Sequence, residues 1–170
     1  MTKHKAAAIV LAAGLGTRME SDRPKVLHSL AGRPMIHWLL DTIAAAGIDD
    51  VTVVIPDGDA GTTVAGAVVP LDTVVQADQL GTGHAVRCVC DAGGVAADDV
   101  LVLFGADPLI TPATMRRLIK ARRAKSNPAV VVLGFRPNDA GNYGRLIVAD
   151  DGSLDAIIEA RDGTQSGKLQ

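Results

Sequence analysis

The stretch from Leu11 to Lys25, LAAGLGTRMESDRPK, combines a glycine-containing backbone with two cationic side chains. It follows an apolar run, so we expect it at the carboxyl end of a strand, where open α/β sheets bind their ligands. Gly14 and Gly16 allow backbone N–H groups to approach a ligand without a Cβ in the way. Arg18 and Lys25 carry charges that suit phosphate oxygens. The stretch therefore predicts a phosphate-binding loop, and the alternative is a structural turn with two solvated cations.

This loop departs from two common nucleotide-binding motifs. The dinucleotide fingerprint requires a third glycine where this chain has Met19. The P-loop requires Gly-Lys-Ser/Thr at a fixed spacing, and none follows Gly14. The loop must therefore hold phosphate by another arrangement.

A second stretch, Gln76–Ala85 (QADQLGTGHA), also follows a short β-branched run and also leads through glycines into a helical pattern. The Gln76 side chain carries one acceptor and two donor hydrogens, which is enough to read the edge of a pyrimidine base. Gly81 and Thr82 would add backbone groups beside it. A surface amide is the alternative for Gln76, and His84 is expected to pack at the start of the helix rather than act as a base.

Composition limits what the chain can be. Its 170 residues are enough for one domain with a sizeable core, and 48% are hydrophobic while only 2% are aromatic. A net charge of -2 argues against a nucleic-acid-binding protein. No apolar run is long enough to span a membrane, and no signal-peptide pattern precedes the first strand. Cys88 and Cys90 form a single C-x-C pair, expected to be free thiols in a reducing cytoplasm.

Strand and helix patterns alternate along most of the chain, which predicts an α/β fold with a mostly parallel sheet and right-handed crossovers. The predicted strands are Ala6–Ala13, Asp50–Ile55, Thr73–Asp78, Asp99–Pro108 and Pro128–Phe135. The predicted helices are Pro34–Gly47, Gly81–Gly94 and Thr111–Lys125, the last with Thr111 as N-cap and Pro112 in its first turn. A turn is predicted over Pro56–Asp59, and a β-hairpin over Gly144–Ala160.

Four segments together resemble one enzyme family from Ala6 to Asp162. They are LAAGLGTRM with PKVLH after it, QADQLGTGHA, NYGRL (Asn142–Leu146) and IIEARD (Ile157–Asp162). The first marks sugar-phosphate nucleotidyltransferases in general, and QLGTGHA is more specific. The chain resembles the uridylyltransferase domain of the bacterial bifunctional N-acetylglucosamine-1-phosphate uridyltransferase/glucosamine-1-phosphate acetyltransferases.

The resemblance implies a Rossmann-like sheet of the nucleotide-diphospho-sugar transferase type, with helices on both faces. It also implies a reaction in which UMP passes from UTP to N-acetylglucosamine 1-phosphate, with Mg²⁺ bound and pyrophosphate released. This reaction supplies cell-wall and lipopolysaccharide precursors. Two alternatives stay open: a fragment that binds UTP or a UDP-sugar with little or no turnover, and a nucleotidyltransferase for another sugar phosphate.

The resemblance also assigns residues. The implied nucleotide-binding residues are Leu11, Ala12, Ala13, Gly14, Lys25, Gln76, Gly81 and Thr82. The implied catalytic residues are Arg18 and Lys25, which would hold the triphosphate and the charge that develops on in-line attack. The implied sugar-binding residues are Gly105, Gly144 and Glu159.

The implied metal ligand departs from the family pattern. That pattern is Gly-Asp-x-Pro-Leu, whereas this chain has Gly105-Ala106-Asp107-Pro108-Leu109, with its acidic residue one place late. In a strand, a shift of one residue turns a side chain to the opposite face. Asp107 is the candidate Mg²⁺ ligand if the backbone adjusts locally, and otherwise it is a turn residue before the proline.

The family continues beyond the position of Gln170 with further sugar-binding and metal-binding residues, and then with a left-handed β-helix acetyltransferase domain. Residues 1–170 are therefore expected to form an incomplete nucleotidyltransferase domain. A homotrimer is expected only for a longer form that carries the β-helix. The expected partners are UTP and N-acetylglucosamine 1-phosphate, with no nucleic acid and no membrane, in the cytoplasm.

Overall fold

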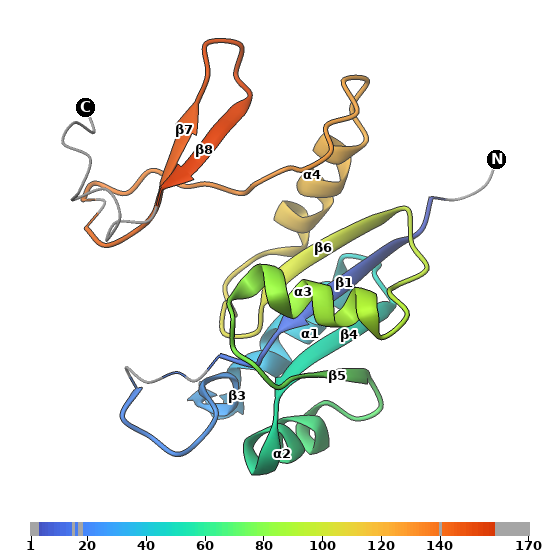
Figure 1. Ribbon diagram of the computed structural model, residues 1–170, viewed down its shortest axis with the longest axis vertical. Helices are drawn as coiled ribbons and strands as arrows, with labels where there is room; N and C mark the ends of the chain where they lie inside the picture. The colour runs from blue at the N-terminus through green and yellow to red at the C-terminus, as the bar shows by residue number, and fades with distance from the viewer. Residues whose placement is uncertain (1–3, 15, 17–18, 140, 159–170) are drawn as a thin grey trace. The chain divides into compact units, whose positions relative to one another are not determined.

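The computed structural model describes residues 4–14, 16, 19–139 and 141–158 of the chain (Figure 1). Backbone packing divides the chain into two compact units, Met1–Val131 and Val132–Gln170. Each unit is described separately below. Most of the predicted site residues belong to the first.

A four-stranded parallel sheet forms the centre of the first unit. Its strands are β1 (Ala6–Leu11), β4 (Asp50–Pro56), β5 (Asp72–Gln76) and β6 (Asp99–Phe104). The order across the sheet is β5-β4-β1-β6, so the chain changes its winding direction between β1 and β6. Open α/β sheets hold their ligands at such a switch point, beyond the carboxyl ends of the strands. The predicted parallel, Rossmann-like sheet is confirmed.

Helices cover both faces of this sheet, as predicted (Figure 1). Three of them, α1 (Met35–Ala45), α2 (Gly58–Val68) and α4 (Pro112–Arg122), contribute buried side chains to the larger apolar cluster. The fourth, α3 (Thr82–Asp91), packs on the smaller cluster of the opposite face. The side chains of β1 alternate accordingly, because successive residues of a strand point to opposite faces. Members of the two clusters from β1 are Ala8 and Val10 on one side and Ile9 on the other.

Short elements connect β1 to α1. A 3-10 helix, η2 (Lys25–Leu27), is followed by the two-residue strands β2 (Ser29–Leu30) and β3 (Arg33–Pro34), which pair in antiparallel fashion. The buried side chains of Val26 and Leu27 fix η2 on the larger apolar cluster. The segment that carries Lys25 is therefore anchored to the core. Within the described residues, no helix is long and apolar enough to cross a membrane.

The start of α4 is formed as its sequence predicts. Thr111 lies in extended conformation before the helix, and its Oγ1 accepts a hydrogen bond from the Thr114 N–H at 3.2 Å. Pro112 occupies the first helical position, where a missing N–H has no cost. The predicted N-cap is confirmed.

Helix α2 was not predicted, because only a turn was expected over Pro56–Asp59. Asp57 caps this helix by accepting the Gly58 N–H at 2.8 Å. Gly61 is buried, and a Cβ on it would lie 2.0 Å from the Pro56 carbonyl oxygen. The close contact with the end of β4 requires glycine, and the same glycine lowers the helix propensity that the sequence displays.

In the second unit, β7 (Arg145–Val148) and β8 (Leu154–Ile158) pair in antiparallel fashion, so the predicted hairpin is confirmed. The predicted strand Pro128–Phe135 is wrong. In the part of the chain that the structure describes, this segment pairs with no strand, and its side chains at Val130, Leu133 and Phe135 are 74%, 54% and 66% exposed. Its β-branched, apolar composition favours a strand, but a strand also needs a hydrogen-bonded neighbour.

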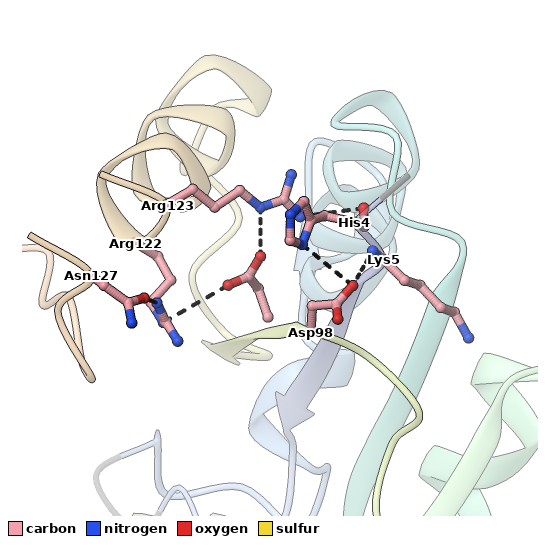
Figure 2. Close-up of polar contacts among 7 residues, drawn as sticks. His4, Lys5, Asp98, Arg122, Arg123 and Asn127 are labelled. Atoms are coloured by element: carbon pink, nitrogen blue, oxygen red, sulfur yellow. Dashed lines mark hydrogen bonds and ion pairs between the residues drawn. The ribbon is translucent and has the colours of Figure 1, made fainter. Parts of the chain in front are cut away.

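A cluster of charged groups joins α4 to the amino ends of β1 and β6 (Figure 2). Asp99 is 8% exposed, and its Oδ2 accepts a hydrogen bond of 2.6 Å from Nε of Arg123, while Arg122 lies 3.8 Å from its Oδ1. The neighbouring Asp98 accepts the backbone N–H of Lys5 at 2.8 Å. These contacts lie at the edge of the sheet away from the carboxyl ends of its strands, so they stabilise the fold without entering the candidate site.

Candidate active site

The residues that follow β1 lie at the switch point of the sheet. The Ala12 N–H donates to the Val54 carbonyl oxygen at 2.8 Å, which holds the chain against the end of β4. Ala12 and Ala13 are buried, whereas Gly14 is exposed. Apart from its chain neighbours, no atom of the described residues lies within 4 Å of the position of a Cβ at Gly14. The chain therefore leaves the core at Gly14 with open space in front of its backbone. A ligand can approach the backbone closely at this point.

Gly105 lies directly against the end of β1. Its N–H donates to the Leu11 carbonyl oxygen at 2.9 Å. A Cβ on this residue would lie 3.0 Å from Cγ1 of Val26 and 3.1 Å from the Leu11 oxygen. Gly105 thus permits the close approach of β6, β1 and η2, which is a structural reason for glycine here besides its predicted sugar contact.

The glycine loop turns back on Lys25. Gly16 has a φ of +61°, and its carbonyl oxygen accepts the Met19 N–H at 2.8 Å. Lys25 begins η2, beside Gly16, with an exposed side chain. The predicted catalytic Arg18 lies outside the described residues. The structure therefore brings one of the two predicted cations to the glycine loop.

Gln76 is the last residue of β5 and is only 4% exposed. Its Nε2 lies 3.1 Å from the Gly81 carbonyl oxygen and 3.1 Å from Nδ1 of His84. The alternative of a surface amide is therefore wrong. Gly81 has a φ of +103° and is the N-cap of α3, so Gln76 is bonded to the loop and to the first turn of the helix that follows it. His84 does pack at the start of this helix, but no sequence pattern predicts its bond to Gln76.

The N–H groups at the start of α3 are available to a ligand. In the part of the chain that the structure describes, the N–H groups of Gly81 and Thr82 donate to no acceptor, and both residues are exposed. Unpaired donors of this kind are usual in the first turn of a helix and favour electronegative ligand atoms. The Gly81 carbonyl, in contrast, is occupied by the Ala85 N–H at 3.2 Å and by Gln76.

The segment around Asp107 differs from the prediction. Strand β6 ends at Phe104, and the Asp107 N–H donates to the Phe104 carbonyl oxygen at 3.0 Å, which closes a turn. The predicted strand to Pro108 is therefore too long, and strand alternation does not apply at this position. Asp107 is exposed, whereas Ala106 is partly buried against the larger apolar cluster. Among the described residues, no group of three or more His, Cys, Asp or Glu could hold a metal ion.

The remaining predicted sugar contacts belong to the second unit. Gly144 is exposed and directly precedes β7. On either side of it, Arg145 donates through its guanidinium to the Tyr143 carbonyl, and the Tyr143 ring meets Phe135 edge-to-face at 4.9 Å between centroids. Glu159 lies outside the described residues. The site in the first unit therefore comprises the β1 loop, Lys25, Gly105 and the Gln76–Gly81 segment.

The chain is similar in structure to two solved proteins. Rv0371c from Mycobacterium tuberculosis H37Rv is 27% identical, with a TM-score of 0.59 over 71% of this chain and 62% of the other. HddC from Yersinia pseudotuberculosis, solved in complex with GMP-PN, has a TM-score of 0.70 at 21% identity over 92% of this chain and 69% of its own. The second likeness supports the fold alone.

Sequence comparison confirms the resemblance inferred from the motifs. The bifunctional protein GlmU of Paramagnetospirillum magneticum is 55% identical over 166 residues, which make up 96% of this chain and 36% of that protein. The bifunctional protein GlmU of Rhodospirillum rubrum is 51% identical over 160 residues, 94% of this chain and 35% of that protein. The chain thus spans little more than a third of the length of these curated relatives. The model of the MobA-like NTP transferase domain matches residues 8–168, and the chain belongs to this family.

Proposed function

We propose that this chain transfers UMP from UTP to N-acetylglucosamine 1-phosphate, giving UDP-N-acetylglucosamine and pyrophosphate. The observation that carries the proposal is the arrangement of Gln76 and Gly81 at the carboxyl edge of the sheet. The motif resemblance and the similarity to two GlmU proteins support the same reaction.

Gln76 and Gly81 offer one acceptor and one donor to a base. Both N–H groups of the Gln76 amide are used within the chain, so its Oε1 is the group left for a ligand. The Gly81 N–H, which donates to no acceptor among the described residues, lies in the same segment. Uracil matches this pair, because its N3–H can donate to Oε1 while its O4 accepts from the N–H. Cytosine presents an acceptor at N3 and a donor at N4, the reverse order, so it would leave both groups unpaired.

The phosphates would lie along the loop between β1 and η2. Gly14 leaves the backbone open to phosphate oxygens, and Lys25, packed against Gly16, adds a positive charge. Arg18 would add a second charge. The sugar-phosphate oxygen attacks the α-phosphorus of UTP, the bond from that phosphorus to the bridging oxygen breaks, and pyrophosphate leaves. No protein nucleophile is needed, so this chain contributes by positioning the reactants and neutralising their charge.

A divalent cation would bind between the phosphates and a carboxylate. Mg²⁺ in nucleotide sites commonly takes one or two carboxylates together with substrate oxygens and water, so an exposed Asp107 beside the switch point suits it. Rv0371c has also been solved in complex with manganese, at 26% identity and a TM-score of 0.55. When bound, the cation would neutralise charge on the phosphates. Asp107 would hold the cation, and Lys25 would add a second positive charge near the phosphates.

The amino sugar would contact Gly105, Gly144 and Glu159. We also propose that the reaction takes place in the cytoplasm, where it supplies precursors of the cell wall, and that a longer form of the protein is a homotrimer.

The test is pyrophosphate release with UTP, Mg²⁺ and a panel of sugar 1-phosphates, alongside a measurement of UTP binding. The proposal requires turnover with N-acetylglucosamine 1-phosphate above that with the other sugars. Turnover with a different sugar phosphate would identify another nucleotidyltransferase. UTP binding without turnover would identify a nucleotide-binding fragment, and absence of both would reject the nucleotide site.

A further inference from the structure

The side chain of His84 makes a contact that the proposed reaction does not itself require. His84 lies in the first turn of α3, and its Nδ1 is 3.1 Å from Nε2 of Gln76. Its other ring nitrogen, Nε2, is 3.9 Å from Sγ of Cys88, one turn further along the helix. The imidazole therefore lies between the base-reading candidate and the body of α3.

These contacts fix the proton positions. The Gly81 carbonyl oxygen can only accept, so the amide nitrogen of Gln76, and not its oxygen, must face it. The second N–H of the same nitrogen points at Nδ1 of His84, which must then present a lone pair. A neutral imidazole with an acceptor at Nδ1 carries its proton on Nε2, the atom that faces the Cys88 sulfur.

The amide oxygen of Gln76 is the polar group that neither of these two contacts uses. Among the described residues, no buried side-chain oxygen or nitrogen lacks a hydrogen-bond partner. Oε1 of Gln76 accepts no bond from the described residues, so it must reach the surface although the residue as a whole is 4% exposed. An oxygen held in this way accepts a hydrogen bond without further ordering of the side chain.

We propose that His84 is a positioning residue that locks the Gln76 amide with its oxygen toward the ligand, and so favours a nucleobase with a donor at the facing position, as uracil has at N3. This inference rests on the proposed function and adds the residue that sets its base preference. Without an acceptor at the position of Nδ1, only the Gly81 carbonyl holds the amide. The amide can then turn, and its NH₂ group would face the acceptor at N3 of cytosine.

Three substitutions separate this role from a packing role. In His84→Asn, Oδ1 replaces Nδ1 and can still accept from Gln76. In His84→Gln, the amide reaches the position of Nε2 instead, toward Cys88. His84→Leu removes both groups. Competition binding of UTP and CTP to each full chain, with thermal unfolding to establish that each variant is folded, gives the base preference.

The wild-type chain and His84→Asn should prefer UTP to a similar degree. In His84→Gln and His84→Leu, the ratio of UTP affinity to CTP affinity should fall about tenfold, which is the effect of one hydrogen bond to the base. Independently, ¹⁵N-detected histidine spectra of the ligand-free chain should show the His84 proton on Nε2 at neutral pH.

The outcomes separate the two proposals. A wild-type chain that binds neither nucleotide, or binds both equally, overturns the proposed uridine site and this inference with it. A wild-type preference for UTP that persists unchanged in His84→Gln and His84→Leu overturns the inference alone. A proton on Nδ1 of His84 in the free chain also overturns it, because Nδ1 could then not accept from Gln76.

Discussion

Gly16 and Lys25 are packed so closely that a Cβ on the glycine would lie 2.9 Å from the Cβ of the lysine. Gly16 also has a φ of +61°, a conformation that side chains disfavour. The two residues lie nine positions apart in the segment that runs from β1 into η2, and this contact brings them together. The position of the lysine charge therefore depends on the absence of a side chain at Gly16.

Gly16→Ala should destabilise the chain by about 1–2 kcal/mol, because the left-handed conformation is strained for alanine and the new methyl group meets Lys25. It should also weaken UTP binding, because Lys25 must move to relieve the contact with the new methyl group, and its positive charge moves with it. Urea unfolding and UTP titration measure the two effects.

Gly14→Ala is the matched control. Among the described residues other than its chain neighbours, no atom lies within 4 Å of a Cβ at Gly14, so the free energy of unfolding should stay unchanged while UTP binds more weakly. If Gly14→Ala and Gly16→Ala destabilise the chain equally, the close contact with Lys25 has no special role.

Lys25→Ala should weaken UTP binding and lower turnover, because a charge-assisted hydrogen bond to phosphate contributes about 1.5–3 kcal/mol. The loss should shrink as salt concentration rises, since Lys25 is exposed. Lys120→Ala, on the exposed side of α4, removes the same charge elsewhere and should leave both quantities unchanged. Wild-type affinity and rate in Lys25→Ala would make the loop a structural turn.

Gln76→Ala should reduce the discrimination between UTP and the competitors CTP and ATP. A site that hydrogen-bonds a base edge rejects ligands that leave its groups unpaired, and this substitution removes one of those groups. Competition titration measures the ratio of affinities. An unaltered ratio would mean that the uridine is read by other residues.

Asp99→Asn should destabilise the fold by about 1–3 kcal/mol, because the arginine side chains at positions 122 and 123 then lose their buried counter-charge. UTP binding should not change, since these groups lie at the amino edge of the sheet. Asp98→Asn is the matched control, because the Asp98 side chain is 55% exposed, and its effect on unfolding should be smaller. Equal effects of the two substitutions would contradict a stabilising role for the Asp99 cluster.

The parts of the fold that could be predicted are those in which local sequence and tertiary packing agree. The strands β1, β4 and β6 are apolar runs bounded by turn residues, and α4 carries its own N-cap at Thr111. Helix α2 could not be predicted, because Gly61 serves a contact with Pro56 that no local pattern reveals. The segment Pro128–Phe135 shows the converse, since its composition favours a strand that has no neighbour among the described residues.

For the candidate site, the sequence predicts which residues take part but not how their side chains are oriented. Gln76 is buried and bonded to His84 because α3 packs against β5. This is a tertiary contact that local sequence does not reveal. The turn that ends β6 likewise depends on one backbone hydrogen bond, from Asp107 to Phe104. Such single contacts change side-chain directions without changing the sequence pattern.

The exchange of Ala106 and Asp107 tests the proposed metal ligand. Position 106 directly follows buried Gly105 at the switch point and is partly buried, whereas Asp107 is exposed at the end of the turn. A carboxylate at 106 would have fewer accessible orientations and less competition from water than one at 107. The family pattern Gly-Asp-x-Pro-Leu also has its acidic residue at the position of Ala106.

We therefore expect the double variant Ala106→Asp, Asp107→Ala to need less Mg²⁺ for half-maximal turnover than the wild-type chain. Its UTP affinity in the absence of metal should be unchanged. Mg²⁺ requires near-octahedral geometry at about 2.1 Å, so a loosely placed ligand should lower the rate more than nucleotide binding. Steady-state kinetics with Mg²⁺ titrated in each form measure the difference. Asp107→Ala alone is the control and should need the most Mg²⁺ of the three. Equal rates and equal Mg²⁺ dependence in the wild-type chain and the double variant would contradict this expectation. Asp107 would then hold Mg²⁺ as well as a carboxylate at position 106 does.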